Sequence, residues 1–282
     1  MNNPEQFFRQ LSAYQARFAA LADGYDGTLA LSAELTEAID AYSASILNEG
    51  NAEAWDYLER ESSSEIAMLA DSLRQTSARC VAIMEKHRAR RLLHGEADGT
   101  DYFSNIESCI EQEFGSFRVA SESKVLMVGS GAFPMTPLYI ARRTGAEVIG
   151  IDIDAEAIEL GRQVVERLGN GLRIRLGSTF IEQLDDIRDV THVIFSSTIA
   201  VKYELLDRLH ALTNPNVVVA MRYGNGCKSL FNYPMLEVDQ ARWRLAEALP
   251  HPGQVFDIAL YTKASAEHGR ASGSPRRLAT TT

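Results

Sequence analysis

The feature that most constrains the fold is a series of short β-branched runs that begins after Ser123. The runs are VLMVGSG (125–131), AEVIGIDID (146–154), LRIRLGS (172–178), THVIFSST (191–198) and NVVVAMRYG (216–224). Helical patterns lie between them, most clearly over 155–168 and 202–212. Nearly continuous apolar strands that alternate with helices are typical of a parallel sheet covered on both faces. The sequence therefore predicts a doubly wound, Rossmann-like α/β domain with a mostly parallel sheet over 116–263.

The first 115 residues show no strand-like alternation and predict a helical N-terminal domain. Apolar residues recur there every three or four positions, as on one face of a helix. The periodic stretches are 7–21, 35–46 and 64–94, and a short helix is expected after Ser104. We expect the second helix to end at Gly50, because glycine readily takes the left-handed conformation that follows a helix. The tail 264–282 is aperiodic and rich in Ser, Gly, Arg and Thr, which predicts disorder.

The charge and composition exclude several classes of function. The chain carries 28 Lys and Arg against 38 Asp and Glu, and residues 1–115 hold 9 of the basic and 20 of the acidic residues. A nucleic-acid partner needs a basic surface, so we expect none. No apolar run reaches the roughly 18 residues that span a membrane, and the polar start lacks the features of a signal peptide. Three widely spaced cysteines form no disulfide pattern, and these features together predict a cytoplasmic protein without membrane contact.

A glycine loop follows the first predicted strand, at Gly129-Ser130-Gly131 and the adjoining Ala132-Phe133. In a doubly wound sheet this turn lies where ligands bind beyond the carboxyl ends of the strands. Gly129 suits a tight turn, and Gly131 lets the backbone approach a ligand. The second strand ends at Asp152, 23 residues after Gly129, where an acidic residue commonly accepts hydrogen bonds from ribose hydroxyls. We expect a nucleoside site here, to which Ile153 and Asp154 also contribute.

Departures from familiar motifs narrow the ligand and the reaction. Pro134 stands where a dinucleotide loop has its third glycine, which favours S-adenosylmethionine over NAD. The third strand leads into Ser178 and Thr179 instead of an acid that would read adenine, so a hydroxyl or backbone amide is expected to serve. The fourth strand leads into Ser196 and Ser197, without the Pro-Pro-aromatic motif of many amine methyltransferases. An ordinary S-adenosylmethionine-dependent methyltransferase is therefore kept only as an alternative hypothesis. A second, non-enzymatic alternative is a module that binds a nucleoside as a sensor and catalyses no reaction.

The stretch 190–238, with THVIFSSTIAVKYELLDRLHAL and NVVVAMRYGNGCKSLFNYPMLEV, resembles the nicotianamine synthases. The shared pattern is a Lys after the fourth strand, an Arg that ends the fifth, and then Gly, a basic residue and Tyr-Pro. These positions are Lys202, Arg222, Gly226, Lys228, Tyr233 and Pro234, and GSGAFPMT and IDID look like the same family. The resemblance implies a helical domain followed by a class I methyltransferase-type domain.

Chain length and two asparagines, Asn225 and Asn232, favour the short bacterial branch that makes opine metallophores of the staphylopine and pseudopaline kind. That branch transfers one 2-aminobutanoate unit from S-adenosylmethionine to the amine of histidine and releases methylthioadenosine. The resemblance thus implies S-adenosylmethionine as co-substrate, a histidine acceptor of either hand, and a downstream opine dehydrogenase. The reaction needs a neutral amine aimed at the methylene carbon, so a group that accepts its proton is expected.

The resemblance also suggests catalytic and acceptor residues, each with a simpler alternative. Glu85 looks like the family's helical glutamate; the alternative is an exposed glutamate that pairs with Arg88. Tyr102 looks like a cleft tyrosine; the alternative is an aromatic packed between the domains. The expected acceptor-binding residues are Arg222, Asn225, Lys228 and Tyr233, of which Arg222 and Lys228 would pair with a ligand carboxylate or else form surface salt bridges.

Two further expectations concern metals and assembly. The six histidines lack acidic or cysteine companions at ligand spacing, so no metal site is predicted in the protein. The apolar face of 7–21 could support a homodimer, although packing against the chain's own helices is the favoured alternative.

Overall fold

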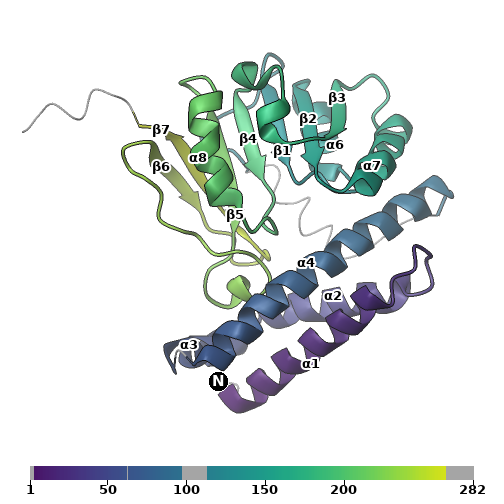
Figure 1. Cartoon of the computed structure of the whole chain (residues 1–282), viewed down its shortest axis with the longest axis vertical. Helices are drawn as coiled ribbons and strands as arrows, with labels where there is room; N and C mark the ends of the chain where they lie inside the picture. Colours follow the sequence, from purple (N-terminus) through teal and green to yellow (C-terminus); the bar gives the residue numbers. More distant parts are fainter. Residues whose placement is uncertain (1–2, 62, 97–112, 265–282) are drawn as a thin grey trace, which may run out of the picture.

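A layer of helices lies against an α/β domain, as Figure 1 shows. The computed structural model describes residues 3–61, 63–96 and 113–264. Asn3 begins the first helix, since its side chain accepts hydrogen bonds from the backbone N–H groups of Glu5 and Gln6. The helices of this layer are α1 (Pro4–Asp23), α2 (Ser32–Ile46), α3 (Glu49–Glu61) and α4 (Ser64–Leu93).

The helical layer departs from the sequence-based expectation between α2 and α3. The α2 helix ends at Ile46, with Leu47 in a right-handed conformation after it. Gly50 lies inside α3, so the prediction that it ends the second helix is wrong. The expected extent of the third periodic stretch, 64–94, is confirmed, because α4 ends at Leu93 and Gly95 follows it with a φ of 86°. The expected helix after Ser104 and the tail 265–282 lie outside the described residues.

The apolar face of α1 is used within the chain. Phe7, Leu11, Phe18 and Leu21 are all buried, and α1 packs against α4. The favoured alternative, packing of this face against the chain's own helices, is therefore confirmed. No helix in the described part of the chain has the length and apolar character needed to cross a membrane.

The α/β domain is built on a seven-stranded sheet of order β3-β2-β1-β4-β5-β7-β6. The five predicted strands pair in parallel, as expected for apolar runs joined by helices. Two further strands, which the sequence analysis did not predict, add an antiparallel edge beside β5. The strands are β1 (Lys124–Val128), β2 (Glu147–Asp152), β3 (Ile174–Ser178), β4 (His192–Phe195), β5 (Val218–Tyr223), β6 (Trp243–Leu249) and β7 (Asp257–Lys263).

Alternate residues of the central strands supply two separate parts of the core. Leu126 and Val193 face the side covered by α8, whereas Val125 and Ile194 belong to a cluster that continues into α6 and the helical layer. The helices of this domain are α6 (Met135–Thr144), α7 (Ala155–Leu168) and α8 (Lys202–Leu212), with short 3₁₀ turns η1 (Ile181–Gln183), η2 (Ile187–Asp189) and η3 (Gly226–Leu230).

The α4 helix is anchored to the α/β domain at two places. In its first half, Arg74 Nη1 donates to the carbonyl of Ser229 in η3 at 2.9 Å. Further along the helix, Lys86 Nζ lies 2.7 Å from Asp154 Oδ2 and 2.6 Å from Glu156 Oε2, at the start of α7. Twelve residues separate the two anchors, about 18 Å along a helix. This span carries α4 across the carboxyl ends of the central parallel strands.

Candidate functional site

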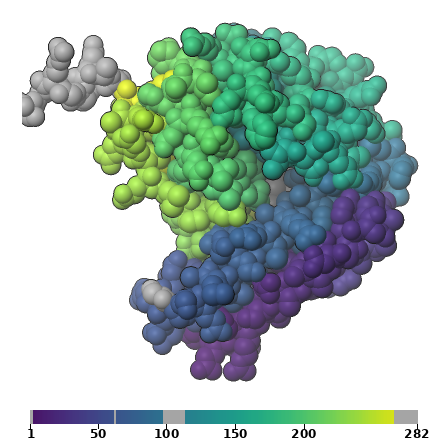
Figure 2. Space-filling view, in the orientation of Figure 1, coloured from purple at the N-terminus to yellow at the C-terminus, as the bar shows by residue number. Residues whose placement is uncertain are grey.

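A cavity of about 690 Å³ lies between the middle of α4 and the carboxyl ends of the parallel strands. Figure 2 shows the molecule hollowed where α4 faces the α/β domain. Most of the predicted site residues line it: Glu85, Gly129, Ser130, Gly131, Ala132, Phe133, Asp152, Ile153, Asp154, Thr179, Ser196, Ser197 and Arg222. Ser178, Asn225, Lys228 and Tyr233 do not line it, and Tyr102 lies outside the described residues.

The glycine loop turns tightly out of β1 and passes under α4. Gly129 and Gly131 have φ values of 79° and 65°, in the left-handed region that favours glycine. The N–H groups of Gly129 and Ser130 both donate to the carbonyl of Ile151, at 2.9 and 3.1 Å, which ties the loop to β2. A Cβ atom on Gly131 would overlap the Glu85 carboxylate. Gly131 therefore serves both the backbone turn and the close approach of α4.

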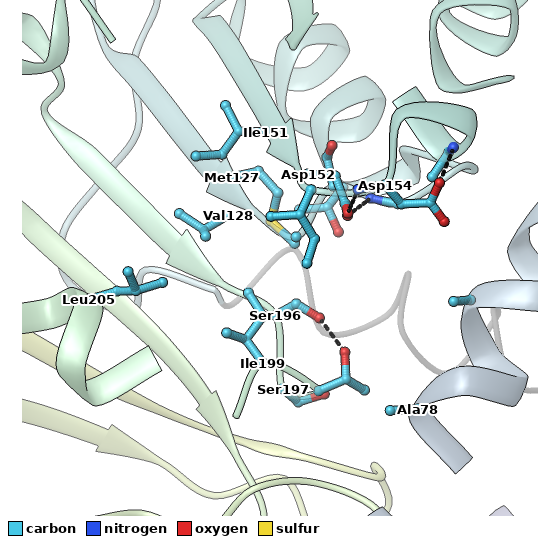
Figure 3. A pocket seen from close by; sticks show the side chains of 18 of the residues that line it. Ala78, Met127, Val128, Ile151, Asp152, Asp154, Ser196, Ser197, Ile199 and Leu205 are labelled. Atoms are coloured by element: carbon cyan, nitrogen blue, oxygen red, sulfur yellow. Dashed lines mark hydrogen bonds between the residues drawn. The ribbon is translucent and has the colours of Figure 1, made fainter. Parts of the chain in front are cut away.

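The two acids of IDID have different surroundings (Figure 3). Asp152 Oδ2 accepts a hydrogen bond from Gly131 N, and its Oδ1 accepts one from Asp154 N, each at 3.0 Å. Asp154 begins α7 by accepting from Glu156 N and Ala157 N, and its Oδ2 pairs with Lys86. Asp152 thus links the glycine loop to the end of β2 inside the cavity, while Asp154 joins α7 to α4.

Glu85 extends from α4 toward the glycine loop and lies in the cavity wall. Its carboxylate accepts a hydrogen bond from the backbone N–H of Ala132. Burial and the nearby negative charge of Asp152 raise the pKa of Glu85 to about 8, although Arg88 and Arg222 act in the opposite direction. Glu85 is therefore not the solvent-exposed surface glutamate of the alternative interpretation, although the charge of Arg88 does act on it. A carboxylate with a pKa near neutrality is suited to accept and release a proton.

Thr198 and Glu182 also line the cavity and were not predicted as site residues from the sequence. Thr198 Oγ1 lies 3.2 Å from Oγ of the predicted residue Ser196, in the turn after β4 (Figure 3). Glu182 lines the cavity beyond Thr179 and pairs with Arg208 at 2.8 Å. An acidic residue is thus present after β3, but it lies four positions later than Ser178, where methyltransferases often have the acid that reads adenine.

Apolar side chains at the cavity remain accessible to solvent. Ile153, Phe180 and Val201 are 80%, 59% and 47% exposed, and all three line the cavity. They come from the turns after β2, β3 and β4. Exposed apolar groups at a concave site are typical of surfaces that a ligand covers.

Arg222 does reach the cavity but already has a carboxylate partner. Its Nη2 lies 2.6 Å from Glu113 Oε2, its Nε lies 2.9 Å from Glu113 Oε1, and the two side chains are 5% and 1% exposed. Arg222 Nη2 also donates to Thr136 Oγ1 at 3.2 Å. Arg222 was expected to pair with a ligand carboxylate. In the structure its carboxylate partner is Glu113 of the same chain, which the sequence analysis had not identified.

The other predicted acceptor residues lie in a segment that the helical layer holds. Lys228 Nζ pairs with Asp257 at 2.6 Å and donates to the carbonyl of His251. Asn225 accepts from Met235 N, and Tyr233 lies below the guanidinium of Arg74. Tyr42 of α2 donates to the carbonyl of Leu230 at 2.8 Å in the same segment. The structure therefore does not bring Asn225, Lys228 or Tyr233 to the cavity, because the motif packs against the helical layer.

Potential metal ligands do not gather in the described residues, where no group of three or more His, Cys, Asp or Glu side chains could hold an ion. His87 is buried against the ring of Tyr25, and His192 lies edge-on to Phe114. Burial lowers the pKa of His192 to about 4. These two rings are packing groups rather than ligands gathered at one point.

Comparison with known proteins relates the whole arrangement to one family. No family model matches the chain. It is 34% identical to the L-histidine 2-aminobutanoyltransferase of Yersinia pestis over 209 residues, which are 73% of this chain and 77% of that protein. The enzyme of the same name from Pseudomonas aeruginosa strain PAO1 is 31% identical over 193 residues, 68% of this chain and 73% of that protein.

Solved structures show the same fold at lower sequence identity. The structure of MtNAS in complex with MTA and tNA aligns with a TM-score of 0.73 at 15% identity, over 92% of this chain and 98% of that one. A glutamine variant of MtNAS in complex with S-adenosylmethionine aligns with a TM-score of 0.68 over 89% and 98%. The chain therefore belongs to the nicotianamine synthase-like family, in the bacterial opine-metallophore branch that includes the L-histidine 2-aminobutanoyltransferases.

Proposed function

We propose that this protein transfers the 2-aminobutanoate unit of S-adenosylmethionine to the α-amine of histidine and releases methylthioadenosine. The observation that carries the proposal is the position of Glu85, whose carboxylate projects from the helical layer onto the glycine loop, inside the cavity and beside Asp152. The names of the relatives, both L-histidine 2-aminobutanoyltransferases, support histidine as the acceptor.

In this proposal the donor lies over the β1 and β2 ends of the sheet. Its methionine moiety contacts the Gly129–Gly131 loop, and its ribose hydroxyls donate to Asp152. Asp152 suits this role better than Asp154, because each oxygen of Asp152 accepts only one backbone hydrogen bond and can accept another. By contrast, Asp154 Oδ1 already accepts two N–H groups at the start of α7, and its Oδ2 pairs with Lys86. Ile153 and Phe180 would cover the adenine, with Thr179 nearby. Glu85 and Asp152 together favour the positive charge of the sulfonium.

The acceptor amine gives up a proton before it reacts. A histidine ammonium that enters the cavity loses one proton to the Glu85 carboxylate and becomes a neutral amine. Its nitrogen then attacks the sulfur-bound methylene carbon of the aminobutanoate chain, the bond between that carbon and sulfur breaks, and the electron pair stays on sulfur in neutral methylthioadenosine. The product is a secondary ammonium that carries the aminobutanoate chain. Glu85 returns its proton to solvent when the product leaves.

Incubation of the protein with S-adenosylmethionine and L- or D-histidine, followed by mass spectrometry, tests the proposal. We expect methylthioadenosine and histidine enlarged by one aminobutanoate unit, formed in equal amounts. The two histidine enantiomers, compared at equal concentration, establish the stereochemistry of the acceptor. S-adenosylhomocysteine with methylated histidine would show an ordinary methyltransferase, and binding of the donor without any product would indicate a sensing module.

The proposal extends to the enzyme that would use the product and to the metallophore that would result. A product with a primary amine at the end of the aminobutanoate chain is a substrate of the kind that an opine dehydrogenase condenses with a 2-oxo acid. We propose such a dehydrogenase as the next enzyme, which would lead to a staphylopine- or pseudopaline-type compound. A cytoplasmic location and a homodimer stay predictions, to be tested by cell fractionation and by light scattering.

A further inference from the structure

A buried lysine at the start of α8 has no part in the chemistry described above. Lys202 is 0% exposed and projects between the ends of β4 and β5. Its Nζ donates to three backbone carbonyls, those of Arg222 at 2.7 Å, Tyr233 at 3.0 Å and Ser197 at 3.4 Å. An ammonium group has three N–H donors, so this set uses all of them.

This arrangement is costly to maintain. Among the described residues no carboxylate lies within ion-pair distance of Lys202, and burial lowers the pKa of its ammonium to about 7. Most buried charges in proteins are paired with an opposite charge. A neutral residue of similar shape would avoid the desolvation cost but would remove a donor from each of the three carbonyls. Those of Ser197 and Tyr233 would then keep only backbone N–H donors, from Tyr233 and Gly224.

The three carbonyls belong to three separate segments that meet at one side of the cavity. Ser197 lies in the turn after β4, Arg222 lies near the end of β5, and Tyr233 follows η3. Ser197 and Arg222 line the cavity themselves, and Tyr233 N donates to the same Ser197 carbonyl at 3.2 Å. Lys202 thus adds a side-chain link between two cavity walls just beyond the last residue pair of β4 and β5, Phe195 and Met221.

We propose that Lys202 is a positioning residue that sets the acceptor side of the cavity, by holding the turn after β4 and the end of β5 at a fixed separation. This inference rests on the proposed function, in which the donor occupies the β1 and β2 ends. The β4 and β5 ends remain for the acceptor. A displacement of about 1 Å in a positioning contact can lower a rate by about 10²-fold.

Lys263 provides a matched control within the same chain. Its Nζ also donates to two backbone carbonyls, those of His210 and Thr213, each at 2.7 Å, and burial also lowers its pKa. These carbonyls lie at the opposite end of α8 from Lys202, and Lys263 does not line the cavity. Lys263→Met therefore removes a comparable lysine without touching the proposed acceptor wall.

The test compares Lys202→Met, Lys202→Arg and Lys263→Met with the wild type. We expect Lys202→Met to lower kcat/KM for histidine about 30- to 100-fold while the Kd for S-adenosylmethionine changes less than threefold. Lys202→Arg, which keeps a charged donor, should recover at least part of this loss, and Lys263→Met should leave kcat/KM within threefold of the wild type. If Lys202→Met does not fold, Lys202→Gln, which keeps two N–H donors, is measured in its place.

Hydrogen–deuterium exchange provides a readout that does not need catalysis. In Lys202→Met we expect faster exchange in peptides that cover 196–200 and 224–233, with no such change in Lys263→Met. A lower melting temperature with unchanged kcat/KM would overturn the proposal and leave Lys202 a structural residue. An equal loss of donor affinity and turnover would also overturn it, since the whole site would then have changed. If the wild type forms no aminobutanoyl product but the exchange result holds, the proposed function fails while the positioning of the two walls stands.

Discussion

Replacement of Glu85 by Gln tests the central step of the proposed reaction. The substitution keeps the size of the side chain and its position against Gly131 but removes the proton acceptor. Loss of a general base commonly lowers a rate by about 10²–10⁴, which corresponds to about 3–5 kcal/mol of barrier. We therefore expect Glu85→Gln to lower kcat by this factor while the Kd for S-adenosylmethionine stays within a few-fold of the wild type.

The raised pKa of Glu85 gives this prediction a pH dependence with a definite sign. With a pKa of about 8, about one tenth of Glu85 is in the basic form at pH 7, and this fraction rises to nearly all above pH 9. Wild-type kcat/KM should therefore rise about tenfold over that range. The free amine of histidine titrates in the same range, so the wild-type rate is divided at each pH by the rate of Glu85→Gln, which cancels the contribution of the acceptor.

The same pKa also predicts an effect on folding stability. Because burial raises the pKa of Glu85 above its ordinary value of 4.5, the folded protein binds an extra proton between about pH 4.5 and 8. The contribution of Glu85 to the free energy of unfolding is fully present below pH 4.5 and is lost as the pH rises through 8. Glu85→Gln should therefore melt at a higher temperature than the wild type at pH 9, by an amount equivalent to a few kcal/mol, with a much smaller difference at pH 5.

Steady-state rates and melting curves of the wild type, Glu85→Gln and the control Glu166→Gln complete the test. Glu166 is exposed on α7, away from the cavity, so its replacement should change neither measurement. Turnover of Glu85→Gln near that of the wild type, or a rate ratio that does not vary with pH, would refute the assignment of Glu85 as the base. The proton would then have to pass to another group, such as Tyr102, Asp154 or water.

Three further substitutions test the donor loop and the packing behind it. Asp152→Ala should weaken S-adenosylmethionine binding by about 1.5–3 kcal/mol, measured by calorimetry, because it removes an ionised hydrogen-bond acceptor; unchanged affinity would exclude Asp152 from the ribose site. Gly131→Ala, at a φ of 65° and against the Glu85 carboxylate, should lower both donor affinity and kcat by at least tenfold, and wild-type values in the same assays would contradict the packing described above. Glu113→Gln should lower the free energy of unfolding by about 3–5 kcal/mol in urea titrations, since it leaves Arg222 buried without its ion-pair partner; a loss below 1 kcal/mol would mean that this pair is not maintained in solution.

The parallel part of the sheet and the donor loop could be predicted because their signals are local. A strand buried on both faces is a continuous apolar run, and a tight βα turn needs glycine at fixed positions, as at Gly129 and Gly131. The edge strand β6 gives a weaker signal, because most of its residues between Trp243 and Leu249 are exposed and polar or small. The α3 helix was missed for a similar reason, since Gly50 and Asn51 near its start are typical of a turn.

The acceptor side of the site could not be predicted, because it depends on contacts between distant segments. Arg222 and Glu113 are 109 residues apart, and nothing in the sequence around either residue indicates the other. Lys228 and Tyr233 follow a strand that ends at the cavity, which made them reasonable candidates. The segment that carries them turns away to pack under α2 and α4, and only the tertiary structure determines this direction.

The position of Glu85 over the donor loop depends on how α4 is held, and this argues that the helical layer sets the choice of reaction. The neighbouring Lys86 pairs with Asp154 at the start of α7, while Asp152, two residues before Asp154, accepts a hydrogen bond from Gly131. The proposed base, Glu85, and the glycine loop are therefore both linked to the same short segment after β2. A shift of α4 by one residue would move Glu85 by about 1.5 Å along the helix axis and turn it by about 100° around it. The methyl and methylene carbons of the donor are bonded to the same sulfur, so a displacement of this size is enough to change which of them an activated amine faces.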